Sequence, residues 1–235
     1  MSNSYGKLYL IPNFLSDDNP DEFIAEMVRK MVYSLKNFVV ENEKQARALI
    51  KRLHLKHSQQ ELHIWLLNEH TPKSEIPDLL KALENEDAGI ISDAGLPCVA
   101  DPGSELVSLA QMKNIEIIPL PGASSMMMAL MGSGFNGQQF CFSGYLPVEK
   151  PLRIRRIKEL EAQMYRGSTQ LFMETPYRNM HVFEDILQSC TAQTKLCIAC
   201  SVSSPSGWVK TKTMAAWKNE KPDIHKKPCI FIIGQ

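Results

Sequence analysis

The first half of the chain alternates short apolar runs with longer segments whose apolar residues recur at helical spacing. The short runs predict strands at residues 8–11, 38–40, 62–66, 88–91 and 115–118. The longer segments predict helices at residues 21–35, 43–53, 74–83 and 105–112. In the second of these helices, Ala46, Leu49, Ile50 and Leu53 fall on one face. This rhythm predicts an α/β domain with a mostly parallel sheet covered by helices.

The second half follows a less regular pattern. Residues 119–122, Pro-Leu-Pro-Gly, interrupt the chain before a predicted helix at 124–131. Further strands are predicted at residues 140–142, 171–173, 196–200, 209–214 and 229–233, and further helices at 151–165 and 179–187. We therefore expect two α/β domains, a parallel one at residues 1–121 and a mixed α+β one at residues 122–235.

Composition narrows the class of protein. The 235 residues can bury a full core, and 44% apolar with 22% charged residues is typical of a globular protein. The 26 basic residues balance the 26 acidic ones, so any RNA contact has to come from a local patch. No apolar run approaches the ~20 residues of a membrane span, and residues 1–7 lack the features of a signal peptide. We therefore expect a cytoplasmic protein with reduced cysteines and no membrane partner.

Two segments follow predicted strands and lead into predicted helices. Residues 91–103 read I-S-D-A-G-L-P-C-V-A-D-P-G, and residues 119–125 read P-L-P-G-A-S-S. Ligands bind beyond the carboxyl ends of strands in such sheets, and small residues let backbone amides approach a ligand closely. A serine at a helix start either caps the helix or helps its amides to hold a carboxylate. A tight turn and a simple helix cap are the alternative interpretations.

These segments resemble two family patterns, S-D-A-G-x-P-x-x-x-D-P-G and P-[IL]-P-G-x-S-[AS]. Two more stretches agree in order: residues 144–147 with a following basic helix resemble G-F-L-P, and residues 172–178 resemble F-Y-E-[ST]-P-H-R. The family is ribosomal RNA small subunit methyltransferase I, within the tetrapyrrole methylase (class III methyltransferase) superfamily. The resemblance covers roughly residues 7–233 and marks the chain as a shortened, divergent member.

The resemblance implies two α/β domains that bind S-adenosylmethionine in the cleft between them, in an enzyme that is usually a homodimer. The cofactor-binding residues that it implies are Ile11, Pro12, Asp93, Ala94, Gly95, Val99, Ala100, Ser124, Ser125, Met173, Glu174 and Thr175. The substrate that it implies is RNA of the small ribosomal subunit, methylated on a ribose 2'-hydroxyl.

The chain also departs from the family. Residues 11–18 replace its glycine-rich loop T-P-I-G-N-L-G-D, and residues 40–44 replace its A-E-D-T-R but keep Glu41. Its H-E-H-N-E survives partly at residues 67–71, and residues 201–207 stand where T-K-x-x-E is expected. These changes affect the substrate side more than the cofactor side, so the sequence defines the methyl donor better than the acceptor.

Methyl transfer mainly requires alignment of the two reactants, and a ribose hydroxyl also has to lose its proton to a base. Glu41, Asp93 and Glu174 are the candidate catalytic residues, because each is predicted at the carboxyl end of a strand. Glu174 has a structural alternative, an ion pair with Arg178.

The remaining chemistry-bearing residues form a basic cluster, a cysteine pair and a histidine group. Arg153, Arg155, Arg156 and Arg178, near Lys150, are candidates to bind RNA phosphates, with a solvated helix face as the alternative. Cys197 and Cys200 lie three apart in a strand, so they point to opposite faces and are predicted to be buried thiols. His54, His57 and His63 lack a fourth ligand and are interpreted as surface residues, so no metal site is predicted.

Three functions remain open at this stage. The first is an S-adenosylmethionine-dependent RNA methyltransferase. The second is a methyltransferase of the same fold that acts on a tetrapyrrole or another small molecule, because the fold does not fix the substrate. The third is a degenerate protein that binds cofactor or RNA without turnover.

Overall fold

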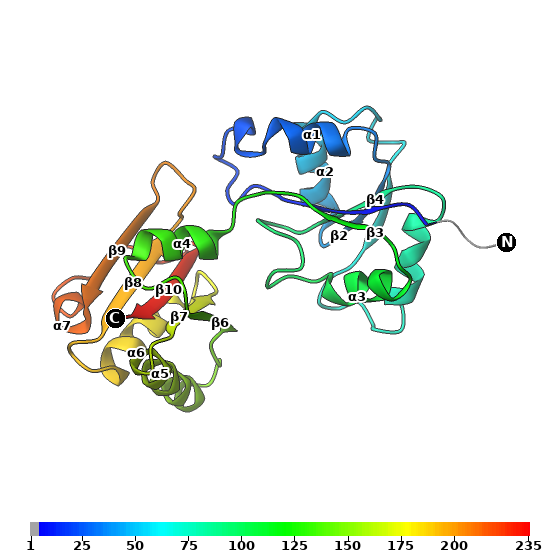
Figure 1. Ribbon diagram of the computed structural model, residues 1–235. Helices are drawn as coiled ribbons and strands as arrows, with labels where there is room; N and C mark the ends of the chain where they lie inside the picture. The colour runs from blue at the N-terminus through cyan, green and yellow to red at the C-terminus, as the bar shows by residue number, and fades with distance from the viewer. Residues whose placement is uncertain (1–4) are drawn as a thin grey trace. The chain divides into compact units, whose positions relative to one another are not determined.

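The computed structural model describes residues 5–235 and divides into two compact units, which meet between Ser124 and Ser125 (Figure 1). The sequence places the boundary between residues 121 and 122. Met1–Ser4 lie outside the described residues, so the interpretation of residues 1–7 as lacking a signal peptide falls partly outside them. Within residues 5–235, no helix is both long enough and apolar enough to cross a membrane.

The first unit is built on a five-stranded sheet. Its strands are β1 (Leu8–Ile11), β2 (Asn37–Val40), β3 (His63–Leu66), β4 (Ala88–Ile91) and β5 (Ile117–Pro119). They lie in the order β3-β2-β4-β1-β5, and every neighbouring pair is parallel. Because the strands are parallel, their carboxyl ends share one edge of the sheet.

Helices cover both faces of this sheet, as Figure 1 shows. The helices are α1 (Glu26–Val32), α2 (Glu43–Leu53) and α3 (Ser104–Met112). Successive strand residues point to opposite faces: Phe38 and Ile91 pack in the core with α1 and α2, whereas Val39 and Ile90 pack in the core with α3. Both faces are therefore buried, which explains why the strands read as continuous apolar runs.

The prediction of a single helix at residues 21–35 is wrong. A short 3₁₀ helix, η1 (Asp21–Phe23), is separated from α1 by Ile24 and Ala25, whose backbone is extended. Ile24 is buried in the core, and the Nε atom of Arg29 donates to its carbonyl oxygen at 3.4 Å. In a continuous helix, a backbone N–H would donate to the Ile24 carbonyl oxygen. Here the side chain of Arg29 donates to it instead.

The helix predicted at residues 74–83 is a 3₁₀ helix, η2 (Ile76–Leu83). Pro77 has no N–H group to donate at the start of this segment. Its flanking bonds span three residues, from Asp78 N to Glu75 O (3.0 Å) and from Glu84 N to Lys81 O (3.2 Å). The tighter helix still buries the apolar face that the pattern indicated, including Leu79 and Leu83.

The second unit contains a mixed five-stranded sheet. Its strands are β6 (Phe140–Tyr145), β7 (Thr169–Glu174), β8 (Lys195–Cys200), β9 (Trp208–Thr213) and β10 (Cys229–Gly234). The order is β6-β7-β10-β8-β9, in which only β6 and β7 are parallel. Its helices are α4 (Ser125–Ser133), α5 (Lys150–Tyr165), α6 (Asn179–Ser189) and α7 (Met214–Trp217).

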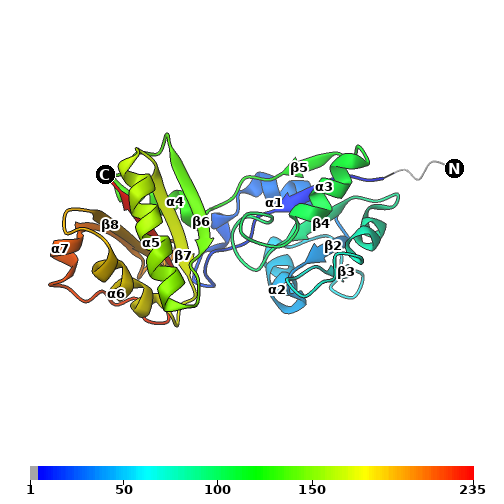
Figure 2. The same ribbon diagram turned by 90° about the horizontal axis from the view of Figure 1, so that it is seen from below.

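The two faces of the second sheet bury different helices. Figure 2 shows α5 and α6 side by side over one face, and the core there includes Ile157 and Ile186. The other face packs against α4 through Ala129 and Leu130. Cys200 belongs to the first of these cores and Cys197 to the second, so both thiols are buried on opposite faces, as the sequence predicts. With two such units, the predicted α/β fold is confirmed.

Candidate functional site

The carboxyl edge of the parallel sheet gathers the polar residues that follow its strands. Asn13 lies beyond β1, Glu41 directly follows β2, and Ser92 and Asp93 follow β4. The strand order places β4 between β1 and β2, so these residues come to the middle of the edge. In open α/β sheets, ligands bind beyond this edge.

Asn13 ties the loop after β1 to the loop after β4. Its Nδ2 atom donates to the carbonyl oxygens of Ser92 (2.9 Å) and Asp93 (3.0 Å), and its backbone N–H donates to Gly95 O (2.8 Å). The side chain is buried. Sequence reasoning missed this residue, although its position directly beyond the first strand was a usable signal.

The loop after β4 adopts an unusual backbone. Gly95 and Gly103 have φ values of 71° and 125°, which favour glycine, but Cys98 and Ala100 also have positive φ values of 67° and 66°. Such a conformation costs a residue with a Cβ roughly 1 kcal/mol or more, and strained residues of this kind cluster at functional sites. Among the predicted cofactor residues here, Asp93, Ala94, Val99 and Ala100 are exposed and Gly95 is buried.

Three carboxylates lie close together at this edge. Glu41 Oε2 accepts a hydrogen bond from the Asp93 backbone N–H at 3.2 Å. Burial raises the pKa of Glu41 and also that of Asp93. Burial, reinforced by the charge of Glu41, raises the pKa of Asp101 to about 6. Across residues 5–235, no basic side chain is ion-paired with any of the three.

Asp101 is a second residue that sequence reasoning did not single out. It lies in the D-P-G turn of the loop, and a hydrogen bond with Ser92 partly offsets the rise in its pKa. The D-P-G turn was visible in the sequence, but the proximity of its carboxylate to Glu41 depends on how the loop folds back.

The other predicted contacts of the first unit have a packing role. Ile11 is fully buried in the core with α1 and α2. Pro12 is buried against Gly122, where an added Cβ would come within 2.1 Å of the Pro12 Cβ. Only glycine permits this close approach between the loop after β1 and the Pro-Gly segment. Ile11 and Pro12 therefore support the edge from beneath, and their contact with a cofactor stays a prediction.

A shallow hollow of about 430 Å³ lies elsewhere on the first unit. It is lined by side chains of α1 and of the end of α2, including Arg29, Tyr33 and His54. Because α2 starts beside the carboxyl edge and runs antiparallel to the strands, its last residues lie toward the opposite edge. The hollow is therefore separate from the three carboxylates.

The remaining predicted cofactor residues occur at the start of α4, where the first unit ends at Ser124, and at the end of β7. Ser124 and Ser125 are half-buried at the junction with α4, and Met173 is also half-buried. Glu174 is fully buried: its Oε2 atom lies 2.6 Å from Arg178 Nη2, and its Oε1 atom accepts from Thr175 N–H at 2.7 Å. Glu174 is thus held by a structural ion pair, the alternative that the sequence left open.

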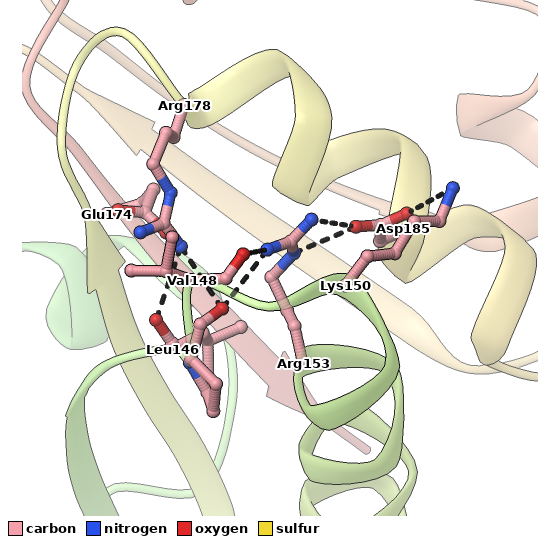
Figure 3. Close-up of polar contacts among 8 residues, drawn as sticks. Leu146, Val148, Lys150, Arg153, Glu174, Arg178 and Asp185 are labelled. Atoms are coloured by element: carbon pink, nitrogen blue, oxygen red, sulfur yellow. Dashed lines mark hydrogen bonds and ion pairs between the residues drawn. The ribbon is translucent and has the colours of Figure 1, made fainter.

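The four candidate phosphate-binding arginines occupy different environments, and Figure 3 shows those of Arg153 and Arg178. Arg153 is buried and paired with Asp185, and Arg178 Nη2 donates to Leu146 O (3.3 Å) and Pro147 O (3.2 Å). Arg156 is half-buried and bonded to Glu159 and Ser143. Arg155, whose side chain is 79% exposed, extends to solvent beside Glu159. Arg155 presents its charge at the surface, Arg156 and Arg178 are partly accessible, and Arg153 is not.

The histidine group is dispersed. His54 and His63 are exposed, as expected, but His57 is half-buried and lies 4.0 Å from Glu61, because the turn after α2 folds it inward. In the part of the chain that the structure describes, no group of three or more His, Cys, Asp or Glu side chains is arranged to hold a metal ion.

The fold is shared with a class of solved enzymes. The methyltransferase CobJ matches with a TM-score of 0.63 and 14% identity, over 98% of this chain and 94% of that one. Uroporphyrin III C-methyl transferase from Thermus thermophilus matches with a TM-score of 0.59 and 13% identity, over 98% of both chains. At these identities the likeness defines the fold, which is that of the tetrapyrrole methylases.

Sequence comparison gives the more specific relationship. Ribosomal RNA small subunit methyltransferase I of Buchnera aphidicola (Schizaphis graminum) is 27% identical over 98% of this chain and 79% of its own length. The Escherichia coli O157:H7 protein of the same name is 27% identical over 79% of this chain, but the match spans 61% of that protein. The Streptococcus pyogenes one is 32% identical over 74% of this chain and 57% of its own length.

A scan against protein-family models finds no match. The chain nevertheless has the fold of the tetrapyrrole methylase superfamily, and its sequence relatives are methyltransferases. Within that superfamily, it is similar to ribosomal RNA small subunit methyltransferase I.

Proposed function

We propose that this protein transfers a methyl group from S-adenosylmethionine to RNA, at a ribose 2'-hydroxyl in the small ribosomal subunit. The observation that carries the proposal is the relationship to the small-subunit rRNA methyltransferases over almost the whole chain. Two of the motifs that support it, at residues 91–103 and 119–125, follow strands β4 and β5 at the carboxyl edge of the parallel sheet, where such folds bind ligands.

The chemistry of this edge fits the cofactor. S-adenosylmethionine carries a positive sulfonium and an ammonium group, and it supplies an activated methyl group. Within residues 5–235, Glu41, Asp93 and Asp101 provide negative charge with no basic side chain ion-paired to them, and burial raises the pKa of each. A bound cation would offset this burial penalty on the charged carboxylates and the smaller repulsion between Glu41 and Asp101. Ala94, Val99 and Ala100 are exposed, so a ligand can approach this loop.

A carboxylate at this edge is also the better candidate for the base. The ribose hydroxyl has to give up its proton, and a base works best when its pKa lies near the working pH. The pKa of Asp101, about 6, meets that condition, and Glu41 is the neighbouring alternative. Glu174 is less suited, because its buried carboxylate is already engaged in an ion pair with Arg178.

On the second unit, we assign phosphate binding to the exposed face of α5. Arg155 and the accessible part of Arg156 lie there, whereas Arg153 and Arg178 hold the segments around them. An RNA substrate is consistent with the cytoplasmic location that the sequence predicts. A homodimer is proposed from the family resemblance alone, and sedimentation velocity would test it.

Methyl transfer from labelled S-adenosylmethionine tests the proposal. We expect label in the 16S RNA of 30S particles that lack the modification, and none after Asp101→Asn combined with Glu41→Gln. Label in a porphyrinoid instead of RNA would support the small-molecule alternative, which the tetrapyrrole methylase neighbours favour. Calorimetric binding of S-adenosylmethionine with no transfer to either acceptor would indicate a protein that binds without turnover.

A further inference from the structure

An exposed tyrosine lies in the motif at residues 172–178, just after strand β7 ends. Tyr177 lies three residues beyond the end of β7, and 69% of its surface is exposed. The Nζ atom of Lys226, which is far away in the sequence, lies 5.7 Å from the centroid of its ring. An aromatic ring and a lysine thus form a pair that is open to solvent.

The backbone that carries this pair is firmly held. Asn179 is fully buried, and its Nδ2 atom donates to Ile224 O (3.1 Å) and Lys227 O (2.6 Å). The Lys226 backbone N–H donates to Pro176 O at 3.0 Å. These bonds fix the loop at residues 224–227 against the segment that carries Tyr177, so binding there would order little additional backbone.

The charge of Lys226 is not neutralised within the described residues. Its neighbour Lys227 pairs with Asp223 at 2.6 Å, and Lys210 and Lys212 both pair with Glu220. Lys226 has no such carboxylate partner in residues 5–235, and its φ of 58° turns the chain sharply at this point. Its ammonium group is therefore available to an external anion.

We propose that Tyr177 and Lys226 form a platform on which one unpaired RNA base stacks while Lys226 contacts an adjacent phosphate. This inference rests on the proposed RNA substrate and extends it to a particular contact. Aromatic rings with nearby cations bind single-stranded nucleic acid in this way, and base stacking tolerates any base. Near Tyr177 and Lys226 in the sequence, Thr175 and His225 are exposed and polar, which differs from the contiguous apolar patch that a protein partner would need.

Fluorescence anisotropy with a labelled single-stranded RNA dodecamer tests the platform in the full chain. Tyr177→Ala should weaken binding about tenfold, and Tyr177→Phe should retain the wild-type affinity, because stacking needs the ring and not the hydroxyl. Lys226→Ala should weaken binding less and reduce the slope of log K against log salt by about one. Tyr33→Ala, which removes a tyrosine of 51% exposure from the first unit, is the matched control and should bind normally.

Each outcome bears on the proposal. The proposal would be overturned if Tyr177→Ala binds RNA with unchanged affinity. It would also be overturned if this variant loses S-adenosylmethionine binding but keeps RNA binding. Wild-type protein that binds no RNA would overturn it as well. If wild-type protein binds RNA through Tyr177 but transfers no methyl group to it, the platform stands and the proposed function fails. If RNA is methylated with the same KM by Tyr177→Ala, the proposed function stands and the platform fails.

Discussion

Arg153 and Asp185 join α5 to α6 through a buried ion pair. Two guanidinium nitrogens contact one carboxylate oxygen, with Nε at 2.8 Å and Nη2 at 2.7 Å from Asp185 Oδ2. The two side chains are only 8% and 3% exposed. Arg153 also donates to the carbonyl oxygens of Pro147 and Val148, so one side chain fixes a helix pair and the turn that leads into it (Figure 3).

Arg153→Ala should therefore destabilise the protein, because it leaves the buried carboxylate of Asp185 with only Lys150 as an ionic partner and removes the donor to Val148 O. We expect a loss of about 3 kcal/mol in the free energy of unfolding, measured by urea denaturation. Arg155→Ala, two residues along the same helix, should change stability by less than about 0.5 kcal/mol. Equal effects of the two variants would contradict the structural role of Arg153.

Asn13→Ala should disturb the candidate cofactor site directly. It removes the donors that hold Ser92 O and Asp93 O, at a cost of about 1–3 kcal/mol in stability. We expect S-adenosylmethionine affinity, measured by calorimetry, to fall about tenfold.

Asn37→Ala is the control for Asn13→Ala. Asn37 is also buried, and its Nδ2 atom donates to Glu86 Oε2 at 2.9 Å, but it lies at the start of β2, at the opposite edge of the sheet. It should lose a similar amount of stability and keep its affinity for the cofactor. Equal losses of affinity would show that Asn13 acts only through general stability.

Asp101→Asn should stabilise the protein at neutral pH. Because the folded-state pKa is raised from 3.8 to about 6, ionisation of Asp101 opposes folding. That penalty is absent below about pH 4 and complete above about pH 7, and solvent screening limits it to about 1 kcal/mol. Thermal melts at pH 7.5 should show a higher Tm for the variant, and melts at pH 4 should show no gain.

Asp21→Asn provides a control of opposite sign for Asp101→Asn. A hydrogen bond from Arg52 lowers the pKa of Asp21, so its charge favours folding at neutral pH. That contribution is lost as the pH falls through the folded-state pKa. Asp21→Asn should therefore lower the Tm at pH 7.5. A gain in Tm from both variants would mean that the amide, rather than the lost charge, is responsible.

Binding of S-adenosylmethionine should release protons near pH 6. At that pH Asp101 is about half protonated, and a cation at the carboxylate edge would lower its pKa and drive the proton off. Titrations at pH 6 in two buffers of different ionisation enthalpy should give different apparent binding enthalpies, and affinity should rise between pH 5 and pH 7. Asp101→Asn should remove most of both effects.

The sequence predicts elements well where one local pattern decides the structure. Residues 8–11, 43–53 and 88–91 form the expected elements without any shift of their ends, because each is an apolar run or amphipathic helix bounded by polar or turn residues. The pattern fails at Ile24, where tertiary contacts hold an apolar residue in extended backbone. Propensity is a weak guide once burial and a side chain such as Arg29 compete with it.

The residues of the candidate site likewise divide into those that the sequence can place and those that it cannot. Glu41 and Asp93 can be placed on one edge from the order of strands and turns alone. The partner of Arg153, in contrast, is Asp185, 32 residues away, and nothing in the basic cluster distinguishes this buried arginine from the exposed Arg155. The contacts of Asn13 and Asp101 depend on how two loops fold onto each other, and no local sequence pattern encodes that arrangement.

The position of β4 in the first sheet also sets an order of events during synthesis. β4 pairs with β1 on one side and with β2 on the other, and these two strands do not pair with each other. A nascent chain that ends before residue 88 therefore has three strands but no strand with which β1 can pair. Residues 88–91 have to leave the ribosome before this sheet can form. β1 therefore leaves the exit tunnel long before its neighbour β4, and it stays exposed to premature association until β4 follows.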